Sequence, residues 1–202
     1  GNYTGTLVNG LMHHLNAQGI PAGEQNRAGL VHRIDKNTSG LLVIAKNEQA
    51  HARLAKQFFD HTIQRRYVAL VWGNFEQDEG TITGNIGRSP RERQKMYVFA
   101  DGSDGKHAVT HWKVLRRYGY VTLVECRLET GRTHQIRVHM AYLGHPILGD
   151  TVYGAKKAVP GLTGQCLHAV GLQFIHPRTK ELVSLTCGLP DEFTAMLRKI
   201  DR

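Results

Sequence analysis

Cysteine, long apolar runs and acidic residues are all scarce in this chain. The three cysteines, Cys126, Cys166 and Cys187, are odd in number and far apart. They therefore argue against a disulfide framework or a paired-thiolate metal site and predict buried, reduced thiols. No stretch approaches the roughly 18 to 20 uninterrupted apolar residues that span a bilayer, and the first residues lack the pattern of a signal peptide. The composition predicts a soluble, cytoplasmic protein with no membrane partner.

Basic residues outnumber acidic ones, and many of them lie close together. The chain has 26 Lys and Arg against 17 Asp and Glu, a formal net charge of +9. The clusters are Arg65-Arg66, Arg116-Arg117, and the group Arg88, Arg91, Arg93 and Lys95. Because clustered cations suit a polyanion, the sequence favours phosphate contacts and a nucleic-acid partner over a merely basic surface.

The spacing of apolar residues predicts an α+β fold. Helical spacing occurs in residues 4–16, 48–60 and 133–143 and again after Pro190. Strand patterns occur in residues 40–45, 67–72, 108–115, 121–128, 167–175 and 182–186. The continuous apolar run at 40–45 predicts a strand buried on both faces, whereas the glycine and arginine content of residues 73–105 predicts exposed, mobile loops and short hairpins. The expected fold is a mixed, mostly antiparallel β-sheet with flanking helices, in a single domain.

Two polar segments are candidates for chemistry. The first, His32-Arg33-Ile34-Asp35-Lys36-Asn37-Thr38-Ser39-Gly40, places a carboxylate before a buried strand, although such a residue often only caps a turn. The second, Thr130-Gly131-Arg132-Thr133-His134-Gln135-Ile136-Arg137-Val138-His139-Met140, concentrates polar groups at the start of a helix. A helix N-terminus suits an anionic ligand, but an amphipathic helix with a solvated basic face would have the same pattern.

Together the two segments resemble the RluA family of RNA pseudouridine synthases, whose motif H-R-[LI]-D-x-x-[ST]-[ST]-G holds a nucleophilic aspartate. Other segments typical of that family follow in order along the chain. They are Arg65-Arg66-Tyr67-Val68-Ala69, Leu148-Gly149-Asp150, Tyr153-Gly154, Leu167-His168-Ala169 and His176-Pro177. The chain is most similar to the RluD and RluC subgroups, and this likeness implies that large-subunit ribosomal RNA or its assembly intermediates are the substrate.

The resemblance implies a role for each of several residues. Asp35 would be the nucleophile, Tyr67 the ring stacked on the target uracil and Arg137 the ion-pair partner of Asp35; by position alone, Tyr67 would be a half-buried sheet aromatic. The implied RNA contacts are Arg33, which would enter the RNA stack, together with Arg65, Arg66, Arg132, His134 and Gln135, of which the last three could instead shape the pocket. The reaction would be an isomerisation, with no cofactor.

Other functions compatible with these residues are a catalytically inactive RNA-binding module, a synthase acting on transfer RNA, and a glycosidase-like hydrolase. The hydrolase would need two suitably spaced carboxyl groups, and the polar segments offer one convincing acid, Asp35. A metal site is not expected, because His134, His139 and His145 lack the i, i+4 spacing of helical zinc ligands. No phosphate-binding Gly-rich motif indicates a nucleotide cofactor.

The resemblance also predicts domain boundaries. Residues 1–202 correspond to the catalytic domain of the family, without its first strand segment and without an N-terminal RNA-binding domain. We expect the protein to be a monomer.

Overall fold

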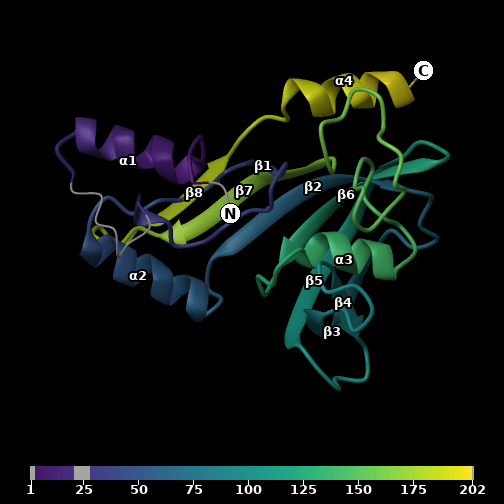
Figure 1. The fold of residues 1–202 in the computed structure, drawn as a ribbon, viewed down its shortest axis with the longest axis horizontal. Coiled ribbons are helices and arrows are strands. Elements are labelled where there is room, and N and C mark those ends of the chain that lie inside the picture. The colour runs from purple at the N-terminus through teal and green to yellow at the C-terminus, as the bar shows by residue number, and fades with distance from the viewer. Residues whose placement is uncertain (1–2, 21–27, 202) are drawn as a thin grey trace. The chain divides into compact units, whose positions relative to one another are not determined.

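The computed structural model describes residues 3–20 and 28–201 of the chain. Its elements are drawn in Figure 1. The helices are α1 (Leu7–Ala17), α2 (Glu48–Phe59), α3 (Gln135–Tyr142) and α4 (Asp191–Ile200). The strands are β1 (Ser39–Gly40), β2 (Gln64–Trp72), β3 (Glu79–Arg88), β4 (Met96–Phe99), β5 (Lys106–Arg117), β6 (Val121–Leu128), β7 (Leu167–Ile175) and β8 (Leu182–Thr186).

The predicted helices form, and their starts follow from the sequence. Thr6 caps α1 by accepting a hydrogen bond from the backbone N–H of Asn9; hydroxyl side chains are preferred at this position of a helix. Asn47 caps α2 in the same way, and Pro190 precedes α4. Helix α3 begins two residues later than predicted, because His134 adopts a left-handed conformation with φ of 56°. This turn separates the polar residues before α3 from the helix itself.

The strands form a mixed sheet in the order β1, β7, β2, β6, β5, β3 and β4, with β8 paired to β7. Strand β1 pairs with β7 in parallel, while the pairs β2–β6, β5–β6, β3–β5 and β3–β4 are antiparallel. Residues 67–71 of β2 are buried without interruption, as expected of a central strand covered on both faces. The prediction of a mixed, mostly antiparallel sheet with helices is confirmed.

The predicted buried strand at residues 40–45 was wrong. Strand β1 ends at Gly40, and residues 41–44 are only half-buried. The backbone N–H of Leu41 still donates to the carbonyl of Ala169 in β7, at 2.9 Å. Farther along, that of Val43 donates to Nε2 of His32 at 3.0 Å, and that of Ala45 donates to the carbonyl of Gly29 at 2.8 Å. Because these acceptors do not belong to one neighbouring strand, no regular ladder forms.

The prediction of loops and short hairpins for residues 73–105 was wrong over β3, which is ten residues long and pairs with β4 and β5. Its glycines had argued against a strand. At Gly80, a Cβ atom would lie 2.7 Å from the ring of Trp112, the residue opposite in β5. The Trp112 ring covers the glycine and supplies the packing that its missing side chain cannot.

The chain divides into two compact units. The first comprises the described parts of residues 1–34, together with 42–63 and 173–184. Within it, Arg53 and Gln57 of α2 donate hydrogen bonds to the carbonyls of Pro177, at 2.7 Å, and Ile175, at 2.9 Å. The expected single catalytic domain stays a prediction. No helix within residues 3–20 and 28–201 is long and apolar enough to cross a membrane.

The second unit comprises residues 35–41, 64–172 and the described part of 185–202, and it contains Asp35, Tyr67 and Arg137. Its main core joins apolar side chains of β2 and β6 with those of α3 and α4, and α3 lies against β4 and β5 (Figure 1). This core fixes the start of α3 relative to the sheet. A rigid frame of this kind can hold a reactive site to within a fraction of an ångström.

The cysteines are free thiols, two of them buried and Cys187 half-buried. Burial raises the pKa of Cys126 and of Cys166 to about 12. Since the thiolate is the reactive form of cysteine, these two side chains contribute packing and no chemistry.

Candidate active site

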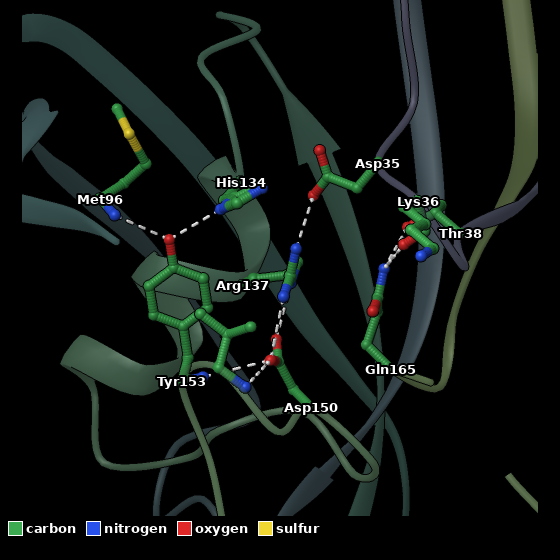
Figure 2. Close-up of polar contacts among 10 residues, drawn as sticks. Asp35, Lys36, Thr38, Met96, His134, Arg137, Asp150, Tyr153 and Gln165 are labelled. Atoms are coloured by element: carbon green, nitrogen blue, oxygen red, sulfur yellow. Dashed lines mark hydrogen bonds and ion pairs between the residues drawn. The ribbon is translucent and has the colours of Figure 1, made fainter. Parts of the chain in front are cut away.

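Arg137, in the first turn of α3, contacts two carboxylates from different parts of the second unit (Figure 2). Its Nη1 lies 3.5 Å from Oδ2 of Asp35. Its Nε and Nη2 donate hydrogen bonds to the two carboxylate oxygens of Asp150, at 2.7 and 3.0 Å. The structure therefore brings together Asp35 and Arg137, which are 102 positions apart in the sequence, and adds a second acid that the sequence analysis had given no role.

The two carboxylates differ in exposure and in the strength of their contacts. The Asp150 side chain is 0% exposed, and its Oδ1 also accepts hydrogen bonds from the backbone N–H groups of Val152 and Tyr153. The Asp35 side chain is 16% exposed and has the longer contact with Arg137. Asp150 thus anchors the guanidinium in a bidentate pair, whereas Asp35 remains accessible to another molecule.

The pKa shifts of Arg137 and Asp150 show that these two groups form a stable ion pair. Burial alone would lower the pKa of Arg137, but the hydrogen bonds and charge of Asp150, with the charge of Asp35, raise it above its ordinary value. Burial alone would raise the pKa of Asp150, but the hydrogen bonds and charge of Arg137 and the backbone N–H groups hold it below its ordinary value. Arg137 is thus a permanent cation beside Asp35 at any physiological pH.

Tyr153 forms the other side of the site. Its hydroxyl accepts a hydrogen bond from the backbone N–H of Met96 in β4 and lies 2.8 Å from Nδ1 of His134. The Arg137 guanidinium lies over its ring, 5.1 Å from the ring centre, a distance at which cation and ring attract each other. One side chain thereby ties the β3–β4 hairpin, the turn before α3 and Arg137 together (Figure 2).

Tyr67 lies in β2, opposite Cys126 of β6, and is 8% exposed. Burial raises the pKa of its hydroxyl; the charge of Arg65 lowers it and the charge of Asp35 raises it. The hydroxyl stays protonated at neutral pH.

The residues predicted to contact RNA have different surroundings. Arg66 pairs with Glu125 at 3.5 Å, and Nε of Arg132 donates a hydrogen bond to the carbonyl of His107 at 2.9 Å. Arg65 is half-buried, and burial lowers its pKa. Arg33 is exposed and belongs to the first unit. Their contacts with RNA remain predictions.

Gln135 is buried, and its amide is fully engaged within the protein. Its Oε1 accepts hydrogen bonds from the hydroxyl of Thr130 and the backbone N–H of Arg132. Its Nε2 donates to the carbonyl of Val109 and to the hydroxyl of Thr110. Of the two roles considered for Gln135, these contacts favour shaping the turn before α3 over touching RNA.

The three histidines considered as metal ligands, His134, His139 and His145, have separate environments. Nδ1 of His134 contacts Tyr153, Nδ1 of His139 contacts the hydroxyl of Thr110 in the core, and His145 contacts the carbonyl of Trp72. Among the residues that the structure describes, no group of three or more His, Cys, Asp or Glu could hold a metal ion. His139 is buried in the core and serves its packing, whereas His134 is half-buried and its contact with RNA remains a prediction.

His139 gives the protein a specific acid sensitivity. Its side chain is fully buried, and burial lowers its pKa from 6.5 to about 4. Between these pH values the unfolded chain binds a proton that the folded protein does not, so stability is complete above about pH 6.5 and falls toward pH 4. We expect this group to remove roughly 3 kcal/mol over that range. Measured by urea unfolding between pH 7 and pH 4, the unfolding free energy of His139→Asn should fall less steeply with decreasing pH than that of the wild type. An equally steep fall in both proteins would show that His139 is not the source of the acid sensitivity.

With this geometry in place, comparisons with known proteins identify the family. The sequence family described as RNA pseudouridylate synthase matches residues 4–142, and the chain belongs to this family. It is 50% identical over 200 residues to the Bacillus subtilis (strain 168) protein named uncharacterized RNA pseudouridine synthase YlyB, and the match covers 99% of this chain and 64% of that protein. It is 46% identical over 207 residues to the ribosomal large subunit pseudouridine synthase D of Zymomonas mobilis, covering 99% of this chain and 65% of that protein.

A solved structure shares the fold. The human RNA pseudouridylate synthase domain containing 4 superposes with a TM-score of 0.71 at 27% identity, covering 85% of this chain and 75% of that one. The chain spans a little under two thirds of the length of the two bacterial relatives. The family assignment applies to nearly the whole chain, and it agrees with the resemblance of the polar segments.

Asp150, Tyr153 and the residues around them were missed as site residues. The segments Leu148-Gly149-Asp150 and Tyr153-Gly154 are typical of the family, but local sequence gave them no chemical role. The signal available in the sequence was that Asp150 lies in a family segment that closely follows the predicted helix with Arg137.

Proposed function

We propose that this chain is the catalytic part of an enzyme that isomerises uridine to pseudouridine in structured RNA. The observation that carries the proposal is the placement of Asp35. It is the aspartate of the family motif, it remains partly accessible, and it lies beside an arginine that Asp150 holds in a fixed orientation. A fixed guanidinium orients a nearby carboxylate, as a nucleophile requires.

In the proposed reaction, Asp35 attacks covalently, at the ribose C1′ or at the pyrimidine ring. The glycosidic bond between C1′ and N1 breaks, the uracil turns, and a bond forms between C1′ and C5. The C5 proton is then lost, N1 gains a proton, and Asp35 leaves as a free carboxylate. The product has the composition of the substrate, so no cofactor, oxidant or reductant is consumed.

Tyr67 is the proposed platform for the flipped base. Extrusion of a nucleotide from a folded RNA costs a few kcal/mol, and stacking on an aromatic ring returns about 1 to 3 kcal/mol per base. The Tyr67 hydroxyl, whose pKa is raised by burial and by the Asp35 charge, is also the proposed relay for the C5 proton: its oxygen accepts that proton as its own proton passes to water.

Basic residues near the site would bind the RNA backbone. Arg66 and Arg132 are at least partly accessible, as are the exposed side chains of Arg88, Arg91 and Arg93 at the β3–β4 hairpin. The Met96–Tyr153 hydrogen bond connects that hairpin with the Arg137 side of the site. The names of several relatives favour large-subunit ribosomal RNA as the substrate, with transfer RNA as the alternative.

A glycosidase-like hydrolase is disfavoured by the state of the second acid. A hydrolase would need one carboxyl group to donate or accept a proton beside the substrate. Asp150 is the carboxylate that shares Arg137 with Asp35, but its side chain is 0% exposed and both of its oxygens are engaged. It cannot reach a substrate or water from that position.

The proposal is tested with transcripts of large-subunit ribosomal RNA and of transfer RNA that carry tritium at C5 of uracil. We expect tritium to pass to water, and to pass faster from the ribosomal transcript. A transcript that is bound but loses no tritium would identify a binding module, and tritium recovered in free uracil would identify a hydrolase; either result would overturn the proposal.

A further inference from the structure

The loop that carries Asp35 is held by residues that follow the part of the chain matched by the family model. That match ends at residue 142, whereas the contacts with residues 36–39 come from residues 163–168. Both segments belong to the second unit. Within the loop, the backbone N–H of Thr38 donates to the carbonyl of Asp35 at 3.0 Å, so Asp35 begins a closed turn.

Gln165 makes the central contacts with this turn. Its Nε2 donates hydrogen bonds to the carbonyl of Lys36 at 2.6 Å and to the hydroxyl of Thr38 at 3.0 Å. Figure 2 shows the Gln165 amide directed at Lys36 and Thr38, while the Asp35 carboxylate points toward Arg137. Gln165 is buried, 6% exposed, and a buried amide that loses its acceptors is costly. One NH2 group therefore holds two positions of the turn, Lys36 within it and Thr38 at its end.

Contacts on either side of Gln165 hold the same loop. The amide of Asn37 donates to the carbonyl of Thr163 at 3.4 Å, and the hydroxyl of Ser39 lies 2.8 Å from Nδ1 of His168. The hydroxyl of Thr163 in turn donates to Glu192, in the first turn of α4, at 3.1 Å. The loop is thus connected to a helix of the second unit by polar contacts in series.

Packing alone does not hold the loop in place. A cleft of about 250 Å³ lies among residues 37–39, 162–167 and the start of α4. On the side that faces this cleft, no protein side chain packs against the loop to resist its movement. The hydrogen bonds of Gln165 therefore carry much of the restraint on the turn that begins at Asp35.

We propose that Gln165 is a positioning residue for the Asp35 nucleophile, an inference that rests on the proposed function. It acts through the Lys36 carbonyl and the Thr38 hydroxyl and does not touch the reacting atoms. A displacement of a reacting group by about 1 Å can cost on the order of 100-fold in rate. Loss of the Gln165 contacts should therefore slow the chemical step and leave RNA binding nearly unchanged.

The test compares Gln165→Met, which keeps an unbranched side chain but removes the donor, with the wild type. We expect single-turnover tritium release to fall about 10- to 100-fold, while the RNA Kd from fluorescence anisotropy changes less than about 3-fold. Thr38→Val, which removes one acceptor, should slow the reaction in the same way, and Thr38→Ser should restore most of the rate. Gln173→Met is the matched control, because Gln173 bonds Ser184 and has no part in the site.

The outcomes separate this inference from the proposed function. A wild type that releases no tritium refutes the proposed function. A wild type that is active, with Gln165→Met within about 2-fold of its rate, refutes the positioning role. A Gln165→Met variant that loses RNA affinity as much as rate also refutes it. If Gln165→Met does not fold, as judged by circular dichroism, the Thr38 pair decides: equal rates for Thr38→Val and Thr38→Ser refute the role.

Discussion

Replacing Asp35 with asparagine is expected to abolish tritium release, by at least about 10³-fold, because the amide cannot form the covalent intermediate. The fold should survive the change. Arg137 keeps its bidentate partner Asp150, and the lost contact is a 3.5 Å pair with a partly exposed carboxylate, worth at most about 1 kcal/mol. Single-turnover assays and thermal unfolding of the same protein sample measure both effects.

The control for this variant is Asp101→Asn. Asp101 is an exposed aspartate that accepts hydrogen bonds from the backbone and hydroxyl of Ser103, and the same chemical change there should leave the rate unaltered. If the rate of Asp35→Asn is reduced by less than about 10-fold, another group forms the intermediate.

Replacing Arg137 with leucine is expected to be the most damaging change for stability. The Asp150 carboxylate is 0% exposed, and without Arg137 its charge would be buried and unpaired. Breaking a buried pair by removing one partner costs about 3 to 5 kcal/mol. Catalysis should fall to background as well, because Asp35 loses its adjacent cation. Urea unfolding at pH 7 measures the first effect and tritium release the second.

The destabilisation of Arg137→Leu should depend on pH in a definite direction. In the wild type the pKa of Asp150 lies below its ordinary value, so the pair stabilises the fold above the unfolded pKa and this stability is lost in acid. In the variant, burial without a cation raises the pKa of Asp150, so the carboxyl group neutralises as the pH falls. The difference in unfolding free energy between the wild type and Arg137→Leu should therefore decrease from pH 7 toward pH 4.

A second substitution supplies the control. Arg137→Leu combined with Asp150→Asn removes the unpaired charge but keeps an oxygen acceptor for the N–H groups of Val152 and Tyr153. The double variant should recover about 2 kcal/mol relative to Arg137→Leu and remain inactive. A double variant no more stable than Arg137→Leu would show that the Asp150 charge is not the source of the loss.

The sequence predicted the outline of the fold because most of its elements are locally encoded. Thr6 and Asn47 mark helix starts, and the uninterrupted apolar run after Tyr67 marks a central strand. Strand β3 could not be predicted in the same way, because Gly80 is compatible with a strand only when Trp112 of a later strand covers it. That compensation is a tertiary contact and leaves no trace in residues 79–88 themselves.

Only those residues of the candidate site that belong to recognised family motifs could be predicted from the sequence. Asp35, Tyr67 and Arg137 were placed by resemblance, and neither Asp35 nor Arg137 had a local pattern that required a function. The role of Asp150 depends on the contact that the start of α3 makes, through Arg137, with the turn after Ile147. The role of Gln165 depends on contacts with residues about 130 positions earlier. Geometry of this kind is set by packing of the whole second unit.

The most direct test of the account is the nucleoside composition of the product RNA. A large-subunit ribosomal transcript treated with the wild type, and separately with Asp35→Asn, is digested to nucleosides and separated by chromatography with mass detection. We predict that the wild type forms one pseudouridine for each uridine lost and that Asp35→Asn forms none. Equal amounts of pseudouridine from both proteins, or loss of uridine with release of free uracil, would contradict the proposal that Asp35 is the nucleophile of an isomerisation.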